Sequence, residues 1–169
     1  QLFRHPDYFF LIIFRGNISE IKTLYEWSEN SYGVDAKKDD IITEDNQKKV
    51  IRMAKELAVK TKAVIVITGE TDLVTDGETV YFIKNGVPEM ARITGCGCML
   101  DGVIAGFIGA NQGNILEATV TAVSAMGICG EYARENAKGT GTLKVHLIDA
   151  MSNIDETWME RSNQIESRS

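Results

Sequence analysis

Two short, unbroken apolar runs constrain the fold most: Tyr8 to Phe14 and Ala63 to Ile67. A strand with one face in water alternates apolar and polar side chains, whereas a strand covered on both faces is apolar throughout. Each run is also far shorter than the roughly 20 apolar residues that cross a bilayer. We therefore expect two strands buried on both faces, no membrane-spanning helix and no membrane association.

Two amphipathic helices are predicted between these runs. Asn17 caps the first helix, and Glu20 stands where the second residue of a capping box is required. The second helix opens at residues 43–45 and buries an apolar stripe over residues 50–58. The order strand, helix, helix, strand predicts an α/β fold in which the two strands are parallel and joined by a right-handed crossover.

The C-terminal half is predicted to contain an antiparallel meander and several helices. Residues 72–93 include the turn pairs Asp76-Gly77 and Asn85-Gly86, which favour a meander at a sheet edge. The expected helices are residues 98–110, 115–137 and 144–154. The first of them is rich in Gly and Ala, which predicts a buried helix that a neighbouring backbone can approach closely.

Domain organisation follows from composition. Hydrophobic residues make up 44% of the chain and charged residues 25%, which is ordinary for a globular protein with one core. No linker or internal repeat interrupts residues 1–159, so we expect a single domain there. Residues 160–169 are predicted to be a frayed polar tail.

Charge and cysteine content argue against two classes of protein. The chain has 18 Lys and Arg against 24 Asp and Glu, a net charge of −6, which argues against a nucleic-acid partner. The three cysteines do not suit a disulfide framework, so we expect a protein of the reducing cytoplasm. A redox or metal module is an alternative, but Cys96, Cys98 and the distant Cys129 lack the paired spacing of zinc sites.

The strongest local signal is a glycine-rich turn, Thr94-Gly95-Cys96-Gly97-Cys98, that leads directly into a helix. Unpaired amides and the helix dipole favour an anion there, and glycines let the backbone approach phosphate oxygens. The alternative is that the glycines only permit a crowded helix entry. Both predicted strands end in polar groups, at Arg15-Gly16-Asn17 and Thr68-Gly69-Glu70. Such ends meet at the sheet edge where ligands bind, which favours the anion site.

These segments resemble the hydroxyethylthiazole kinase family of thiamine salvage in order and spacing. The resemblance covers about Leu11 to Ala150 and is carried by Arg15-Gly16-Asn17 with Ser19-Glu20, Gly33-Val34-Asp35, Thr68-Gly69-Glu70 with Asp72, Asp76-Gly77, Asn85-Gly86 and Thr94 to Cys98. It implies the ribokinase-like fold, with a mostly parallel central sheet between helices. The family's N-terminal segment has no counterpart before Gln1, so we expect the chain to correspond to the C-terminal part of such a kinase.

The resemblance also implies an activity and residue roles. The family transfers the γ-phosphate of ATP, with Mg²⁺, to the hydroxyl of hydroxyethylthiazole, and its members form trimers. The implied ATP contacts are Arg15, Asn17, Thr68 and Gly97. Gly95 is implied to meet the thiazole, Glu20 to lie near Mg²⁺ and the phosphates, and Cys98 to act as base where related kinases have aspartate.

Each role has a structural alternative. Asn17 and Glu20 fit a helix cap on its own. Thr68 fits the end of a strand, and Arg15 fits a surface position. The resemblance favours the functional interpretation of Arg15 and Thr68, while the cap and the site are compatible for the other two residues.

Three further features lie outside these roles. Asp101 is interpreted as a solvated or helix-start charge, and Cys129 as a packed core thiol. Gly139-Thr140-Gly141-Thr142 stands where the family usually has Gly-Pro-Gly-Ser, so we expect a more flexible loop near the nucleotide base.

The sequence leaves more than one function open. A kinase for hydroxyethylthiazole is the first hypothesis, and Cys98 in place of aspartate favours it over a kinase for another small alcohol such as hydroxymethylpyrimidine. The second class is a non-catalytic nucleotide-binding or assembly fragment. It would bind nucleotide without thiazole-dependent release of ADP.

Overall fold

A computed structural model describes residues 12–28, 42 and 46–168 of the chain. The elements, in chain order, are β1 (Ile13–Gly16), α1 (Ile18–Ser28), α2 (Gln47–Thr61), β2 (Val64–Ile67), β3 (Asp72–Thr75), β4 (Val80–Ile83), the 3-10 helix η1 (Pro88–Arg92), α3 (Cys96–Ala110), α4 (Ile115–Asn136), α5 (Thr140–Asn153), α6 (Glu156–Ser162) and β5 (Ile165–Arg168). The expected strand residues 8–11, the motif at residues 33–35 and the helix opening at 43–45 lie outside the described residues.

The strands form one mixed sheet in the order β1-β2-β3-β4-β5. β1 and β2 are parallel, with Arg15 opposite Val66 and Gly16 opposite Ile67. The pairs β2–β3, β3–β4 and β4–β5 are antiparallel. The predicted α/β class and the parallel pair are therefore confirmed. The described sheet is mixed rather than mostly parallel, because the meander and the C-terminal segment add antiparallel strands to it.

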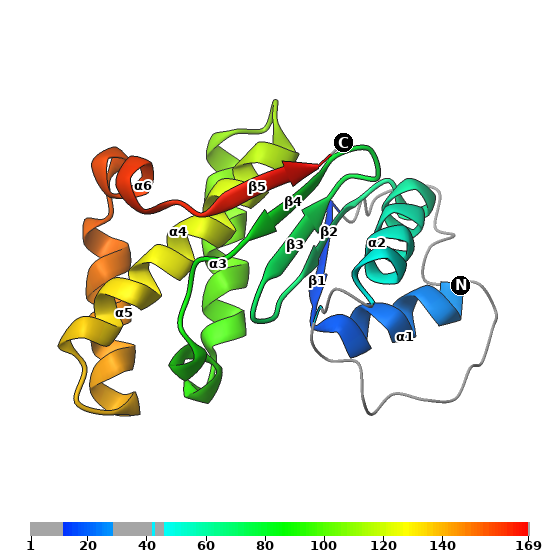
Figure 1. Cartoon of the computed structure of the whole chain (residues 1–169). Coiled ribbons are helices and arrows are strands. Elements are labelled where there is room, and N and C mark those ends of the chain that lie inside the picture. Colours follow the sequence, from blue (N-terminus) through cyan, green and yellow to red (C-terminus); the bar gives the residue numbers. More distant parts are fainter. Residues whose placement is uncertain (1–11, 29–41, 43–45, 169) are drawn as a thin grey trace.

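Helices cover both faces of the sheet (Figure 1), and each face has its own core. On one face, α1 and α2 bury their apolar stripes against Ile65, Ile67 and Phe82. On the other, α3, α4 and α5 pack against Val64, Val66 and Val74. β2 is buried on both faces as predicted, because its successive side chains point alternately into the two cores.

β1 differs from its prediction in position and burial. The strand extends through Arg15 and Gly16, and Ile13, Phe14 and Arg15 are only partly buried. Ile12, just before it, is 44% exposed. The reason is that β1 is the edge strand of the described sheet, so that no further strand covers its second edge.

The helices between the parallel strands follow the sequence pattern. α1 buries Ile18 and Ile21, and α2 buries Val50, Ala54 and Leu57 on the predicted stripe. Burying a Leu or Ile side chain stabilises a fold by about 1.5–3 kcal/mol, so these stripes fix both helices on the sheet.

The predicted meander is confirmed only in part. β3 and β4 form a hairpin around Asp76-Gly77, and Gly77 has the positive φ of +102° that suits glycine. After β4 the chain forms a loop and η1 rather than a further strand. The hairpin is not at the sheet edge either, because β5 pairs with β4 along its other side.

The C-terminal segment is another difference from expectation. Residues 165–168 form β5, whereas a frayed tail was predicted for residues 160–169. β5 is polar and largely exposed, so its sequence lacks the apolar residues that indicate a buried strand. Its backbone pairing with β4 holds it, together with Lys84, which forms an ion pair with Glu166.

The burial predicted for α3 is wrong, although the helix itself is confirmed and begins at Cys96. Leu100 and Ile104 alone of its side chains are fully buried, while Gly102, Ala105 and Gly106 are exposed. Among the described residues, no atom lies within 4 Å of a Cβ built on either glycine. The small residues therefore face away from the core instead of admitting a neighbouring backbone.

Close backbone approach occurs in α4 instead. A Cβ built on Gly127 would lie 2.6 Å from the Cβ of Asn85 and 2.7 Å from its carbonyl oxygen. The buried Asn85 side chain accepts hydrogen bonds from Ser124 Oγ and the Gln164 amide, at 3.0 and 2.9 Å. Its amide group donates to the Ser162 carbonyl at 2.8 Å. The loop after β4 is thereby locked to α4 and to the C-terminal segment.

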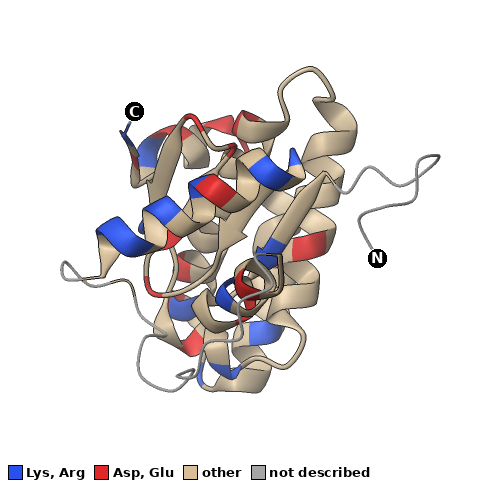
Figure 2. Cartoon of the chain, turned by 90° about the vertical axis from the view of Figure 1, so that its right-hand side faces the viewer, with Lys and Arg blue, Asp and Glu red and all other residues tan. Residues whose placement is uncertain are grey.

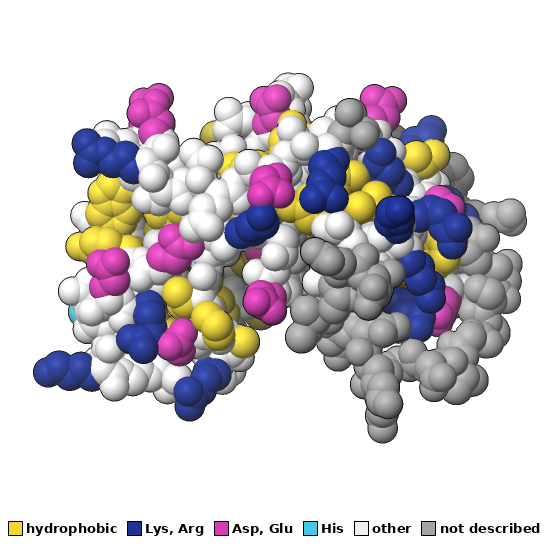
Figure 3. Space-filling model, in the orientation of Figure 1, with side chains coloured by type: hydrophobic (Ala, Val, Ile, Leu, Met, Phe, Trp, Pro, Cys, Tyr) yellow, Lys and Arg dark blue, Asp and Glu magenta, His cyan; other side chains and the backbone are white. Residues whose placement is uncertain are grey.

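The surface carries both signs of charge, unevenly distributed. Exposed basic residues recur along α2, at Lys48, Lys49, Arg52 and Lys60. Figure 2 shows the blue segments of the ribbon that mark Lys and Arg positions. In the space-filling view, dark-blue side chains gather over this part of the molecule, while acidic and basic groups alternate over α4 to α6 (Figure 3). No helix among the described residues is long and apolar enough to cross a membrane.

Candidate functional site

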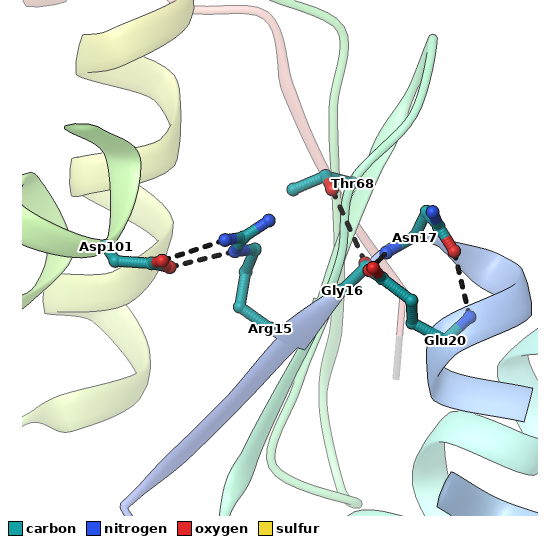
Figure 4. A network of polar contacts seen from close by, with 6 residues as sticks. All are labelled: Arg15, Gly16, Asn17, Glu20, Thr68 and Asp101. Carbon is teal, nitrogen blue, oxygen red and sulfur yellow. Dashed lines mark hydrogen bonds and ion pairs between the residues drawn. The ribbon is translucent and has the colours of Figure 1, made fainter. Parts of the chain in front are cut away.

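The carboxyl ends of β1 and β2 lie side by side, as the parallel pairing predicted. The Thr68 amide donates to the Gly16 carbonyl at 2.8 Å, and the Thr68 hydroxyl lies 3.4 Å from the same oxygen. Asn17, which follows Gly16, is thus beside Thr68 (Figure 4). Two of the predicted ATP contacts are therefore neighbours at one edge of the sheet.

Asn17 and Glu20 form the predicted capping box. The Glu20 amide donates to Asn17 Oδ1, and the Asn17 amide donates to Glu20 Oε2, both at 2.8 Å. Gly16 is tightly placed, because a Cβ there would lie 2.9 Å from Glu20 Oε2. The cap engages one Glu20 oxygen, so the carboxylate retains Oε1 as a possible ligand.

Glu20 offers a single carboxylate to Mg²⁺, which limits how the ion could be held. Mg²⁺ commonly takes one or two protein carboxylates and completes its shell with water and substrate phosphates. Among the described residues, no group of three or more His, Cys, Asp or Glu side chains could enclose a metal ion. Glu20 therefore fits an ion held mainly by phosphates, and the three cysteines do not form a metal site within the described chain.

The glycine-rich turn opens α3 as predicted. Gly95 is the N-cap residue with φ of +86°, a left-handed conformation that favours glycine. The helix begins at Cys96, so the amides of Gly97 and Cys98 have no partner within the helix. The Cys98 side chain is exposed. Two amides and a thiol are thus available at the positive end of a helix dipole.

Arg15 joins β1 to this helix start. Its Nε donates to Asp101 Oδ1 and its Nη2 to Asp101 Oδ2, both at 2.8 Å. On the other side, a Cβ built on Gly97 would lie 3.1 Å from Arg15 Nη1. The hydrogen bond to Asp101 raises the pKa of Arg15 above its ordinary value, against the lowering effect of burial. The guanidinium therefore remains charged beside the first turn of α3.

Asp72 is the first residue of β3, directly after the turn that follows β2. Its Oδ1 accepts a hydrogen bond from the Gly69 amide at 2.8 Å, which closes the turn after Thr68. Burial raises the pKa of Asp72 to about 7, and this hydrogen bond opposes the shift only partly. The carboxyl group thus changes charge near neutral pH, a property that the sequence did not indicate.

The remaining cysteines are less accessible than Cys98. Cys129 is a buried residue of α4, which confirms that it is a packed thiol, and burial raises its pKa to about 11. Burial also raises the pKa of Cys96, and the charge of Arg15 partly offsets this effect. Neither thiol is suited to reaction at neutral pH.

The segment Gly139-Thr140-Gly141-Thr142 is not the loop that was expected. Residues 140–142 are the first turn of α5, and Thr142 Oγ1 accepts hydrogen bonds from the amides of Lys138 and Gly139, at 2.9 and 3.1 Å. Thr142 thus satisfies amides that would be unpaired in a loop. From the same helix, Lys144 Nζ donates to the Thr94 carbonyl at 3.3 Å, which adds a cation to the glycine-rich turn.

The structure brings the predicted residues to one end of the sheet. Arg15 and Gly97 are in contact, Asn17 and Glu20 are bonded to each other, and Thr68 lies beside them. Asp101, which was expected to be a solvated or helix-start charge, is the partner of Arg15. The spacing shows only that Asp101, four positions after Gly97, lies on the same face of α3 as Gly97, and it does not indicate the pairing with Arg15.

A cavity of about 670 Å³ lies beside the ion pair, between β1 and α3. Its lining is mainly apolar, with Ile12, Ile104 and Ile108 on its walls and Arg15 and Asp101 at the polar end. A second cavity, of about 410 Å³, is lined by η1, the end of α4 and the start of α5.

These features define an α/β protein in which a guanidinium and helix-start amides gather at the carboxyl end of parallel strands. Residues 7–157 match the sequence model of the hydroxyethylthiazole kinase family. The match spans most of the chain, and the chain therefore belongs to this family.

Curated relatives agree. The chain is 41% identical over 163 residues to hydroxyethylthiazole kinase 1 of Clostridium botulinum strain Loch Maree, a match that covers 96% of this chain and 58% of the relative. It is 40% identical over 158 residues to the hydroxyethylthiazole kinase of Clostridium acetobutylicum, covering 92% of this chain and 58% of the relative. The chain thus spans a little over half the length of these relatives.

The fold agrees with a solved structure. The structure of a hydroxyethylthiazole kinase protein from Pyrococcus horikoshii superposes with a TM-score of 0.79 at 24% identity. The superposition covers 94% of this chain and 55% of the other. At this identity the likeness shows a shared fold, and the confirmed α/β architecture is that of the family.

Proposed function

We propose that the chain provides the nucleotide side of a kinase that uses MgATP to phosphorylate the hydroxyl of 4-methyl-5-(2-hydroxyethyl)thiazole in thiamine salvage. One observation carries the proposal: the Arg15 guanidinium lies against Gly97, at the first turn of α3. Guanidinium and helix-start amides together suit a phosphate group. Family membership supplies the reaction class.

The geometry supports a proposal for the phosphate contacts. Arg15 and the amides of Gly97 and Cys98 receive the transferring phosphoryl group, because the guanidinium lies against Gly97 in the first turn of α3, where these amides have no partner within the helix. Thr68 and Asn17 contact the nucleotide from the neighbouring strand ends. Phosphoryl transfer depends mainly on such positioning and charge stabilisation.

Glu20 is proposed to hold Mg²⁺ through its uncommitted oxygen, directly or through water. A bound ion there would neutralise charge on the phosphates during transfer. The capping box supports this role, since it fixes the Glu20 side chain through the Asn17 amide.

Gly95 and Cys98 are assigned to the acceptor alcohol. Gly95 presents its backbone without a side chain, and a Cβ there would meet no described atom within 4 Å. The alcohol oxygen attacks the γ-phosphorus, the bond to the ADP oxygen breaks, and the hydroxyl proton passes to the Cys98 sulfur, which acts in its thiolate form. The exposed position of Cys98 at the helix start supports this assignment.

The assembly and location are also proposals. We place the protein in the cytoplasm, which suits its three unpaired cysteines. We expect a homotrimer. On α5, Val145 and Ile148 are 57% and 46% exposed and offer apolar surface for contacts between subunits. Analytical ultracentrifugation would give the mass of the assembly. We also propose that residues 1–159 form one domain. β5, which follows it in the chain, joins the sheet of this domain by pairing with β4.

The test is release of ADP from MgATP with and without hydroxyethylthiazole, alongside calorimetry of nucleotide binding. Release that depends on the thiazole supports the kinase. A second candidate is a nucleotide-binding or assembly module without turnover. Binding of MgATP without release would select it. Release that depends on hydroxymethylpyrimidine instead would reassign the acceptor.

A further inference from the structure

The ion pair between Arg15 and Asp101 has a geometry that a simple surface charge pair does not require. Two nearly equal hydrogen bonds, both 2.8 Å, join Nε and Nη2 to the two carboxylate oxygens. Such a fork fixes the plane of the guanidinium as well as its position. It also connects the carboxyl end of β1 with the second turn of α3.

α3 provides the opposite side of the seat through Gly97. A Cβ at this position would lie 3.1 Å from Nη1, 3.2 Å from Nη2 and 3.4 Å from Cζ of Arg15. The guanidinium therefore packs against bare backbone. Gly97 and Asp101 are four residues apart, so one face of the helix supplies both the support and the carboxylate.

The fork leaves one nitrogen uncommitted. Asp101 accepts from Nε and Nη2, and within the described chain Nη1 makes no hydrogen bond. In Figure 4 the third guanidinium nitrogen points away from Asp101, on the side of Thr68. Nη1 is also the guanidinium nitrogen nearest to a Cβ built on Gly97, at 3.1 Å, in the first turn of α3 where the proposed phosphate site lies. The pair thus directs a free donor toward that site.

Stability and charge do not account for the pair. The side chains of Arg15 and Asp101 are 22% and 51% exposed, and exposed pairs contribute only about 0–1 kcal/mol to folding. Arginine is also charged at every physiological pH without help from a carboxylate. Orientation is the property that the bidentate contact adds.

We propose that Asp101 is a positioning residue that keeps Arg15 bidentately bound while Nη1 meets the phosphoryl group. This inference rests on the proposed function of the site. The pair persists when nucleotide binds, so Asp101 acts on the geometry of transfer and does not compete with phosphate for Arg15.

Asp101→Asn tests the inference by separating binding from turnover. The amide keeps the shape but accepts only one of the two hydrogen bonds. Loss of orientation should lower kcat at least tenfold. Asp101→Asn removes a negative charge near the phosphate, which favours binding of MgATP, while the weaker orientation of Arg15 disfavours it. Because the two effects oppose each other, the Kd of MgATP should change by less than threefold. A change in Kd alone, with kcat preserved, would overturn the proposal.

Two further variants make the comparison specific. Asp149→Asn removes the same charge from an exposed position on α5 and should leave both kcat and Kd unchanged. Arg15→Lys keeps the positive charge but cannot form the fork, and should lose turnover. Combining it with Asp101→Asn should cause little further loss, because both changes remove one interaction. Fully additive losses in kcat would contradict a shared role.

A readout independent of turnover is the NMR signal of the Arg15 Nε proton. In the parent chain it should stay protected from exchange with and without MgADP, and Asp101→Asn should abolish the protection. Loss of protection when MgADP binds would show that Arg15 leaves Asp101, which overturns the proposal. If the parent binds nucleotide without thiazole-dependent turnover, the kinase function fails while this signal still decides the role of Asp101. Absence of nucleotide binding would refute both.

Discussion

At the scale of single residues, Asp72 gives the chain a specific pH dependence. Burial raises its pKa from 3.8 to about 7. Between these values the folded chain binds a proton that the unfolded chain does not, so stability falls as pH rises and is lowest above pH 7. Asp72→Asn removes this ionisation and retains an acceptor for the Gly69 amide.

The variant should therefore gain stability over the parent as pH rises. The difference in free energy of unfolding should grow by on the order of a few kcal/mol between pH 4 and pH 8, since each pKa unit corresponds to about 1.4 kcal/mol. Urea denaturation at both pH values measures it. A difference that stays constant over this range would show that burial does not hold the proton on Asp72.

Cys98 is predicted to assist transfer without being required for nucleotide binding. Cys98→Ala should lower kcat by about 10–100-fold, near the lower end of general-base effects, because positioning provides most of the catalysis. Cys98→Asp should retain activity, since a carboxylate can take the same proton. Calorimetry should give similar MgATP affinity for both variants and the parent. Loss of binding in Cys98→Ala would contradict the assigned role.

Single residues also show what the sequence could and could not predict at the site. The capping box of Asn17 and Glu20 was predictable, because it depends on local spacing alone. The partner of Arg15 was not, because Asp101 lies 86 positions away and only the packing of α3 against β1 brings them together. The raised pKa of Asp72 likewise depends on burial, which a single polar residue at the start of a strand does not reveal.

At the scale of elements, α3 and α4 use their glycines in opposite ways. Gly106 in α3 faces open space among the described residues, whereas Gly127 in α4 is in contact with the backbone of Asn85. Gly106→Ala should stabilise the chain by about 0.5–1 kcal/mol through helix propensity. Gly127→Ala should destabilise it by about 1–3 kcal/mol, because the loop after β4 must move.

Thermal and chemical unfolding of the two variants measure this contrast directly. Both changes add one methyl group to a helix, so each is the control for the other. Equal effects on stability would mean that Asn85 does not pack against Gly127 as described.

Helices and strands were predicted correctly where the pattern of apolar residues indicates which face is buried. β2 and the stripe of α2 are buried on the expected faces, since unbroken or periodic apolar residues indicate them. β5 was missed because its strand character comes from pairing with β4 and not from its own polar sequence. The burial of α3 was misjudged because small residues suit a crowded face and an open face equally.

At the scale of the whole molecule, the parallel part of the sheet positions the residues of the candidate site, and the antiparallel part packs against α4. The parallel pair β1–β2 brings Arg15 and Thr68 to one end, next to α3. The antiparallel strands support α4, whose buried face forms much of the second core. The family was identifiable from the sequence because its motifs cluster at strand ends, while the mixed topology emerged only from the pairing.

The most direct test of the kinase proposal is ADP release from MgATP by this chain, measured with and without hydroxyethylthiazole. Calorimetry of MgATP binding accompanies it, so that a silent assay can be traced to binding or to transfer. The proposed function predicts binding of MgATP and release of ADP that depends on the thiazole. No binding and no thiazole-dependent release would contradict it, and would mean that Arg15 and the start of α3 do not receive a nucleotide phosphate in this chain.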